Sequence, residues 1–374
     1  MGFFKRGKQE KTTQPKSAKP KASQAAAAPA IKLPTKDDFR GDIELAAAAD
    51  ALTTGSWAEA DALIDERGED GWTERELQNI GSKVPQVINA WVDAEPSARS
   101  LSFKGRAMVD AAWDIRGGGL GSSVAFGDAL TFRGLLAEAD EVLVEAISLD
   151  ETSAAPWAVR LPVGMGLQKD KDTMRGYFDQ VHSRAPFHAS AVSSMSQVLA
   201  EKWGGSEGEL LEFARWAQSE SPAGHPVRGT LPMAVHECGF AAAFKAKQAG
   251  ITDSIHKAYS AYCGTFDEEL TAGAVELLEA STEVAPPPLV SAFNLYFYHA
   301  SAFTAPIPLL KKLIVAVDNR SVDYPWGMFV KNGPREDFES YQQRTIRIIR
   351  LREENPTLGV PELATMLLDS LRAA

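Results

Sequence analysis

Apolar residues recur along most of this chain at intervals of three and four, the spacing that places them on one face of an α-helix. The clearest stripes run through residues 135–149, 309–317 and 360–371. Alternation of polar and apolar residues, which is typical of half-buried strands, is nearly absent. The sequence therefore predicts an all-α fold of about 14 to 16 helices, most of them paired antiparallel.

Helix-start signals agree with this periodicity. Thr73 and Ser206 are each followed three residues later by a glutamate, which is the spacing of a capping box. Pro361 precedes the last apolar stripe, and proline is favoured in the first turn of a helix. We therefore expect helices to begin near these three positions.

Charge divides the chain into a basic beginning and an acidic remainder. The 374 residues include 39 Lys and Arg and 50 Asp and Glu, a net charge of −11. Residues 1–36 hold nine basic residues and one acid, a charge of +8. Residues 37–374 hold 30 basic and 49 acidic residues, a charge of −19. The two parts are expected to behave differently in solution.

The basic segment 1–36 is otherwise mostly Ala, Pro, Ser, Thr and Gln. It has too little apolar surface to offset the entropy of ordering it, so we predict a disordered tail. A solubilising tail that folds back weakly on the acidic remainder is favoured; the alternative is contact with an anionic membrane surface through Phe3 and Phe4 beside the basic run. We divide the rest into a helical-repeat body, 37–330, and C-terminal capping helices, 331–374.

The acidic remainder argues against nucleic-acid binding, which needs a basic surface. A basic helix is predicted over 335–352, followed by a short helix after Gly359, and the pair resembles a helix-turn-helix. Its arginines are offset by neighbouring acids, so a cap on the end of the body is favoured over a DNA-binding element. Because a secretory signal and a membrane-spanning segment are both missing, we predict a cytoplasmic protein, with peripheral attachment to the membrane as the alternative.

Four short patterns repeat at similar spacing. Two begin with glycine and continue with large and small apolar residues, and two consist of a helix followed by proline: Gly55-Trp57-Ala60-Ile64, Gly134-Leu136-Ala139-Leu143-Ala146, Phe178-Val181-Pro186 and Leu210-Ala214-Ala217-Pro222. Three closing positions, Glu151, Pro186 and Pro222, are 35 and 36 residues apart. These patterns resemble tetratricopeptide repeats, which are helical hairpins of about 34 residues.

The tetratricopeptide resemblance implies antiparallel hairpins stacked as an α-solenoid over about 50–240, with a concave face that holds a peptide or protein. It places hairpin turns at Gly55 and Gly134. The alternative is a non-repetitive helical domain with chance periodicity. A looser resemblance, carried by the segments 112–117, 203–206 and 213–215, is to an uncharacterised family of bacterial helical-repeat proteins, and it implies no activity.

Six residues are candidates for binding. Arg116 precedes a glycine-rich segment, 117–121, that can present N–H groups to an anion, although a flexible loop between hairpins is favoured. Trp113 and Trp203 stand in two of the segments of the looser resemblance. Tyr296 and His299 belong to an aromatic stretch that either forms core or lines a groove. Trp326, in a predicted loop, is interpreted as an exposed anchor.

Catalytic and metal-binding patterns are missing. His236, Cys238, His256 and Cys263 are the only candidates for a metal cluster, but their spacing is not that of a zinc site. Core cysteines and surface histidines explain them better. We therefore predict no metal, no cofactor and no catalytic residues.

The sequence as a whole favours a protein-interaction scaffold that binds a partner protein or peptide through a helical-repeat surface. One alternative is an enzyme of unfamiliar type with a site inside the helical body. The other is an adaptor that residues 1–36 tether to an anionic membrane.

Overall fold

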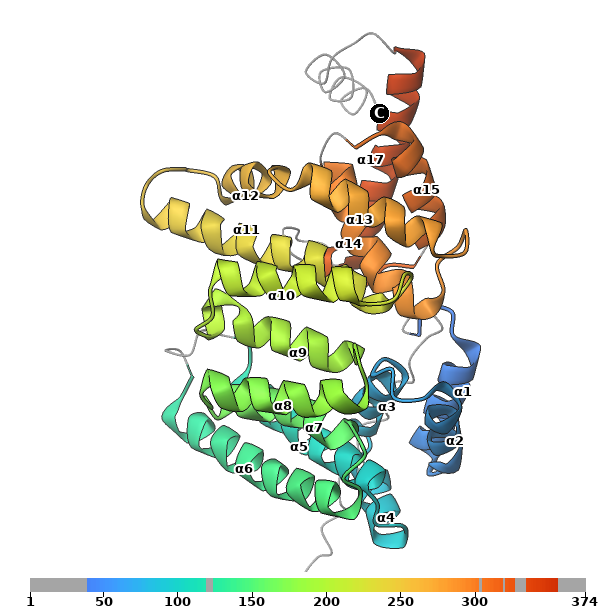
Figure 1. Ribbon diagram of the computed structural model, residues 1–374, viewed down its shortest axis with the longest axis vertical. Coiled ribbons are helices and arrows are strands. Elements are labelled where there is room, and N and C mark those ends of the chain that lie inside the picture. The colour runs from blue at the N-terminus through green and yellow to red at the C-terminus, as the bar shows by residue number, and fades with distance from the viewer. Residues whose placement is uncertain (1–38, 119–123, 303–304, 319, 327–333, 356–374) are drawn as a thin grey trace, which may run out of the picture. The chain divides into compact units, whose positions relative to one another are not determined.

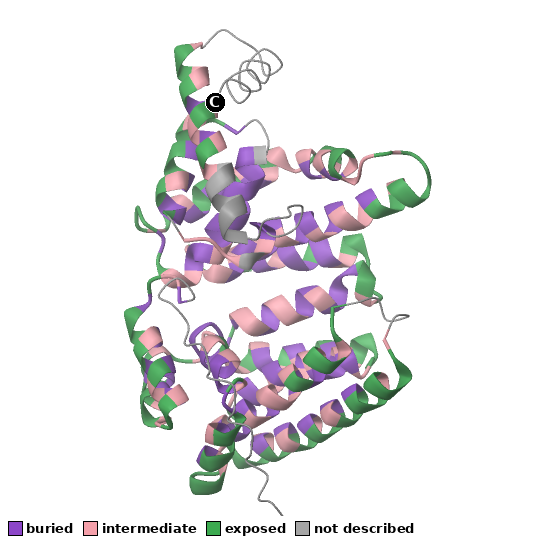
Figure 2. Ribbon diagram, turned by 180° about the vertical axis from the view of Figure 1, so that it is seen from behind, coloured by how far each residue is buried: buried purple, intermediate pink, exposed green. Residues whose placement is uncertain are grey.

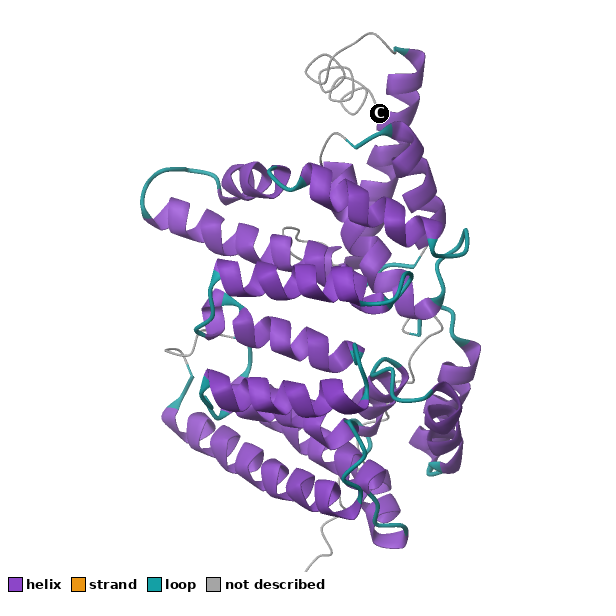
Figure 3. Ribbon diagram, viewed as in Figure 1, coloured by secondary structure: helices purple, strands orange, loops and turns teal. Residues whose placement is uncertain are grey.

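The computed structural model describes residues 39–118, 124–302, 305–318, 320–326 and 334–355, and all regular structure in these ranges is helical (Figure 3). The predicted all-α class is therefore confirmed. The tail 1–36 and the stripe 360–371 lie outside the described residues. None of the described helices combines the length and the apolar character needed to cross a membrane.

The described ranges hold seventeen α-helices, slightly more than the number predicted (Figure 1). The first ten are α1 (Ile43–Thr54), α2 (Ala58–Arg67), α3 (Thr73–Gly81), α4 (Pro85–Ala94), α5 (Ala98–Arg116), α6 (Phe126–Leu149), α7 (Ala155–Gly166), α8 (Lys171–Arg184), α9 (Ala189–Leu199) and α10 (Glu207–Glu220). The others are α11 (Thr230–Gln248), α12 (Ile255–Gly264), α13 (Asp267–Glu279), α14 (Val290–Ala302), α15 (Ile307–Val317), α16 (Asp323–Trp326) and α17 (Pro334–Glu354). Three short 3₁₀ turns are η2 (Glu201–Trp203), η3 (Pro226–Gly229) and η4 (Pro287–Leu289).

Most helices contact the helices next to them in the chain. Helices α5, α6, α7 and α8 pack in succession, and α11 packs along α12. Contacts also join alternate helices, since α5 touches α7, α7 touches α9, and α9 touches α11. One hydrogen bond joins distant parts of the described chain: Arg320 Nη1 donates to the carbonyl of Arg40, 280 residues earlier, at 3.3 Å.

Side-chain caps fix several helix starts. Asp42, Ser97, Asp170, Ser206 and Ser254 each accept a hydrogen bond from a backbone N–H in the first turn of the helix that follows. Such caps satisfy donors that have no partner inside the helix. The helix start predicted at Ser206 is confirmed.

The N-cap predicted at Thr73 is wrong. Helix α3 begins at Thr73 itself, after Trp72, which gives no side-chain cap. The carboxylate of Asp70 instead accepts from the N–H groups of Trp72 at 2.8 Å and Thr73 at 3.2 Å. Asp70, in the preceding turn, therefore caps the start of α3 in place of Thr73.

The buried apolar residues form three clusters. A large cluster runs from Ala154 to Ile349 and joins α7 to α17. A smaller one, from Phe39 to Phe103, holds α1–α5 together, and a third lies between α5, α6 and α7. The large cluster includes Ile349 of α17, so this helix shares a core with the body.

The hairpin turn predicted at Gly134 is wrong. Gly134 lies in the middle of α6, which is continuous from Phe126 to Leu149. The helix continues because the buried stripe of Phe132, Leu136 and Ala139 passes through this point without a break. Gly55, by contrast, does end α1 in a left-handed conformation, with φ of 101°, and α1 packs against α2 after it.

Candidate functional site

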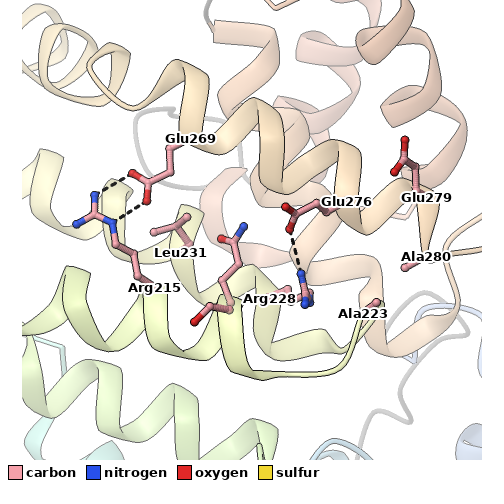
Figure 4. A pocket seen from close by; sticks show the side chains of 10 residues that line it. Arg215, Ala223, Arg228, Leu231, Glu269, Glu276, Glu279 and Ala280 are labelled. Carbon is pink, nitrogen blue, oxygen red and sulfur yellow. Dashed lines mark hydrogen bonds and ion pairs between the residues drawn. The ribbon is translucent and has the colours of Figure 1, made fainter.

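A groove of about 790 Å³ lies between α10 and α13, with η3 and the start of α11 at its base (Figure 4). Charged side chains line it from both sides. Its lining residues are Arg215, Gln218, Ser219, Ala223, Arg228, Leu231, Glu269, Glu276, Glu279 and Ala280. We call this cavity the α10/α13 groove.

Two ion pairs span the α10/α13 groove. Arg215 of α10 donates from Nε and Nη2 to the two carboxylate oxygens of Glu269, at 2.6 and 2.8 Å. Arg228 donates from Nη1 to Glu276 at 3.1 Å. The hydrogen bonds from Arg215 hold the pKa of Glu269 below its usual value. The pair of Arg215 with Glu269 therefore joins α10 to α13, and the pair of Arg228 with Glu276 joins η3 to α13.

The guanidinium of Arg228 is fixed by more than its ion pair. Its Nε donates to the carbonyl of Pro222 at 3.0 Å and its Nη2 to the carbonyl of Ser221 at 2.8 Å. The backbone carbonyl of Arg228 in turn accepts from the hydroxyl of Tyr296 at 3.1 Å. The base of the groove is therefore rigid, which favours a preformed binding surface.

Gln218 contributes an unsatisfied acceptor to the same groove. Its Oε1 is buried and has no hydrogen-bond partner among the described residues. A Cβ added to Gly273 would lie 2.7 Å from Gln218 Nε2 and 2.6 Å from the Tyr296 hydroxyl oxygen, so glycine allows α13 to approach here. Burying an acceptor without a donor is costly.

A second groove lies on the other side of α10, against α8, with a volume of about 430 Å³. Aromatic and acidic side chains line it. They are Arg175, Phe178, Asp179, His182, Glu209, Glu212, Phe213 and Trp216. The ring of Trp216 lies 5.2 Å from Phe213 and 5.3 Å from His182, centroid to centroid. We call this cavity the α8/α10 groove.

The two grooves flank one exposed ridge of α10. Glu212, Arg215 and Ser219, which are spaced at three and four residues, form this ridge and are all exposed. Glu212 lines the α8/α10 groove, whereas Arg215 and Ser219 line the α10/α13 groove. A ligand lying across α10 would therefore reach both cavities.

The combined surface is acidic. Asp179, Glu212 and Glu279 are exposed, and none of them forms an ion pair with another residue that the structure describes. The two linings together hold six acidic side chains and three arginines; Arg215 and Arg228 are paired with glutamates, and Arg175 is exposed in the α8/α10 groove. These carboxylates add to the charge of −19 that residues 37–374 carry.

Three of the residues predicted from the sequence meet elsewhere. Trp113 and Arg116 lie at the end of α5, and Trp203 ends η2. The two tryptophan rings meet edge to face at 5.6 Å, and the guanidinium of Arg116 lies 5.4 Å from the Trp113 ring and 5.6 Å from the Trp203 ring. This cluster lies outside both grooves. The glycine-rich segment after Arg116 is described only to Gly118 and from Val124.

The other three predicted residues are core. Trp326, interpreted as an exposed anchor, is only 1% exposed, and its Nε1 donates to Asn294 Oδ1 at 2.6 Å. That interpretation is wrong, because α16 packs Trp326 against α14. Tyr296 and His299 are also buried, and His299 lies 2.8 Å from the carboxylate of Asp267. The stretch is core; only Tyr296 touches the base of a groove.

No group of three or more His, Cys, Asp and Glu side chains suited to a metal ion is found in the described ranges. His236 is completely buried rather than on the surface as predicted, and burial lowers its pKa to about 3. Its Nδ1 is hydrogen-bonded to the Tyr259 hydroxyl at 2.5 Å. Cys238 and Cys263 are buried thiols, as expected for core cysteines.

The residues that line the grooves were missed as a site by sequence reasoning. Neither Glu269 nor Arg215 is singled out by the sequence analysis. Nothing local relates the two, because they are 54 residues apart in the chain. Only the packing of α13 on α10 brings them together.

Comparison with known proteins gives no matching family model, no match to a curated protein and no match to a solved structure.

Proposed function

We propose that this protein is a helical recognition scaffold that binds a basic peptide segment of a partner protein across α10, in the α10/α13 and α8/α10 grooves. Stacked helical hairpins in α5–α11 supply the rigid support in this proposal. The contacts between alternate helices, α5 with α7, α7 with α9 and α9 with α11, support such a stack.

The observation that carries the proposal is the set of acceptors that the grooves leave available. The carboxylates of Asp179, Glu212 and Glu279 lie along this surface, are exposed, and form no ion pair with another residue that the structure describes. The side chains of Lys and Arg carry only donors. The ammonium and guanidinium groups of a basic segment can therefore donate hydrogen bonds to these carboxylates.

The aromatic wall of the α8/α10 groove supports the same ligand chemistry. A cation over the face of an aromatic ring gains about 0.5–1 kcal/mol at an exposed site. Trp216 and His182 are half-exposed in this groove, beside Asp179 and Glu212. The combination of an aromatic face and carboxylates suits a guanidinium or ammonium group. The negative charge of the body also speeds the approach of a basic partner.

The test measures fluorescence anisotropy of the full chain with a labelled peptide of about twelve residues in which Arg alternates with Ser, a length that crosses a helix in extended form. A peptide with Glu in place of Arg is the charge control. We expect saturable binding of the Arg peptide only, weakening as salt rises.

Variants then separate the grooves from the general charge. Glu212→Gln and Glu279→Gln each remove one groove carboxylate and are expected to weaken binding about threefold. Glu66→Gln on α2 removes the same charge from an exposed position far along the chain and is expected to change nothing. Equal weakening by all three variants, or no binding of the Arg peptide, would overturn the proposal.

A further inference from the structure

The outer face of α6 carries apolar side chains that nothing described in the structure covers. Phe132, Leu136, Ala139, Leu143 and Ala146 are buried against α5 and α7. On the outer face, Phe126 is 79% exposed, and Leu130, Val144 and Leu149 are each exposed by half or more. Figure 2 shows exposed residues along the length of this helix. Four large apolar groups on one helix are more than scattered surface residues explain.

Three of these four residues, Phe126, Leu130 and Val144, lie on one stripe, whereas Leu149 stands to one side of it and lines a groove with Trp91 and Glu95. Phe126, Leu130, Gly134, Ala137 and Val144 follow one another at helical intervals of three, four and seven. Large residues therefore stand toward both ends of the stripe and the two smallest stand in its middle. This is the profile of a helix that another helix crosses closely at its centre, because small residues let two backbones approach.

Gly134 gives a second, independent indication. Glycine inside a helix destabilises it by about 1 kcal/mol relative to alanine. A Cβ built on Gly134 would meet no atom within 4 Å, so packing within the described chain does not require glycine there. Close approach of a second molecule at this point is a physical reason for it.

We propose that this face binds a second copy of the chain, with the two α6 helices antiparallel and a two-fold axis passing near Ala137. This register brings Leu130 of each copy level with Val144 of the other. Phe126 comes level with Ser148 and lies beside Leu149. A self-complementary patch of this kind is what a two-fold dimer requires.

The charges of α6 favour the antiparallel arrangement over the parallel one. Arg133 is the only basic residue between Phe126 and Leu149; Asp128 precedes it, and the other four acids, Glu138, Asp140, Glu141 and Glu145, follow it. Antiparallel packing brings Arg133 level with Asp140 and Glu141 of the other copy. Parallel packing would place Arg133 beside Arg133 and acid beside acid. The helix dipoles also oppose each other favourably when the helices are antiparallel.

The occupant is therefore inferred from charge and shape together. Neither Arg133 nor Glu141 forms an ion pair with a residue that the structure describes, and both are exposed. Asp140 is held by Arg160 at 2.7 Å, which keeps that carboxylate in place beside Glu141. The dimer face is separate from both grooves of α10, so the two proposals stand or fall independently.

The first experiment is sedimentation velocity of the full chain over a wide range of concentrations. We expect reversible monomer–dimer exchange. Leu130→Asp is expected to shift the dissociation constant upward by tenfold or more, about the effect of burying a charge in an apolar contact. Ile251→Asp is the matched control, because Ile251 is equally an exposed apolar residue, in the turn between α11 and α12, and should leave the dimer unchanged.

The second experiment tests the register. Arg133→Glu and Glu141→Arg are each expected to weaken the dimer about fivefold, and the double variant to restore it, since both copies then carry the reversed pair. Gly134→Leu is expected to weaken the dimer, whereas Gly176→Leu, in the middle of α8 with equally open space, is not. A chain that stays monomeric at all concentrations, or a double variant no tighter than either single variant, would overturn the proposal.

Discussion

The N-terminal helices and the C-terminal helices of this protein both bury an ionisable side chain, but of opposite kinds. Glu74 on α3 is 3% exposed, and burial raises the pKa of its carboxyl to about 8. His236 on α11 is 0% exposed, and burial lowers the pKa of its imidazole to about 3. In both regions burial favours the neutral form, since charge in a low-dielectric interior is costly.

The two regions therefore lose stability on opposite sides of neutral pH. Because the folded pKa of Glu74 lies above its unfolded value of 4.5, its contribution is complete below pH 4.5 and is lost as pH rises toward 8. Because the folded pKa of His236 lies below 6.5, its contribution is complete above pH 6.5 and is lost as pH falls toward 3. The comparison shows that an ionisable group buried without an ion pair is tolerated where the surrounding pH keeps it neutral.

Glu74→Gln is expected to have the largest effect. The amide keeps the shape of the carboxyl and removes its titration, so the free energy of unfolding should rise by about 3 kcal/mol at pH 7. Urea denaturation at several pH values between 4.5 and 8 measures this. The free energy of unfolding should fall with rising pH in the unchanged protein, and this fall should disappear in the variant. Glu66→Gln, at an exposed position on α2, is the control. An unchanged pH dependence in Glu74→Gln would contradict the comparison.

Tyr259→Phe tests the C-terminal side. It removes the hydroxyl bonded to His236 Nδ1 and leaves that buried nitrogen only the longer contact with Cys263 Sγ, at 3.9 Å, which should cost about 2 kcal/mol. Tyr262→Phe is a matched control on the same helix, because its hydroxyl bonds to Glu207 at an exposed position and water can replace it. Thermal unfolding followed by circular dichroism distinguishes the two. Equal losses of stability in the two variants would mean that burial of the Tyr259–His236 pair does not increase its contribution to stability.

His188→Asn is expected to act only in acid. Burial lowers the pKa of His188 to about 4, so its contribution is lost as pH falls below 6.5. Asn can still cap α9, as His188 does through Ala191 N–H at 3.3 Å. The difference in free energy of unfolding between the variant and the unchanged protein should shift in favour of the variant by about 1 kcal/mol between pH 7 and pH 5.5. His225→Asn, at a half-exposed cap, should show less. An unchanged acid slope in His188→Asn would be the contrary result.

Glu269→Gln is expected to have the smallest effect. The side chains of Arg215 and Glu269 are 49% and 34% exposed, and an ion pair this exposed contributes about 0.3 kcal/mol. Urea denaturation at low and high salt should show a small difference that salt removes. A loss above about 1 kcal/mol would show that the α10/α13 contact contributes to stability as the buried groups do.

The fold class could be predicted because helical periodicity is a local property. The stripes at 135–149 and 309–317 lie within α6 and α15 as expected. The turn at Gly134 could not be excluded from the sequence, because one glycine is compatible with either a turn or a helix interior. Packing along Phe132 and Leu136 decides between them.

The candidate site was much less predictable. Trp113, Arg116 and Trp203 were chosen for residue type and do meet, whereas the grooves are built by pairs such as Arg228 and Glu276, 48 residues apart. No periodicity or motif connects such residues. Trp326 shows the converse, since its proline-containing loop suggested exposure and the side chain is core.

The hydrogen bond from Arg320 to the carbonyl of Arg40 has a consequence for the order of folding. Most helices contact chain neighbours, and such contacts close short loops that form quickly. The contact between Arg40 and Arg320 joins residues 280 positions apart and carries the largest closure entropy of any described here. It is therefore expected to form last, so that a chain emerging from the ribosome assembles its helical hairpins in sequence. The hydrogen bond between Arg320, which follows α15, and Arg40, which precedes α1, can form only after α15 has been synthesised.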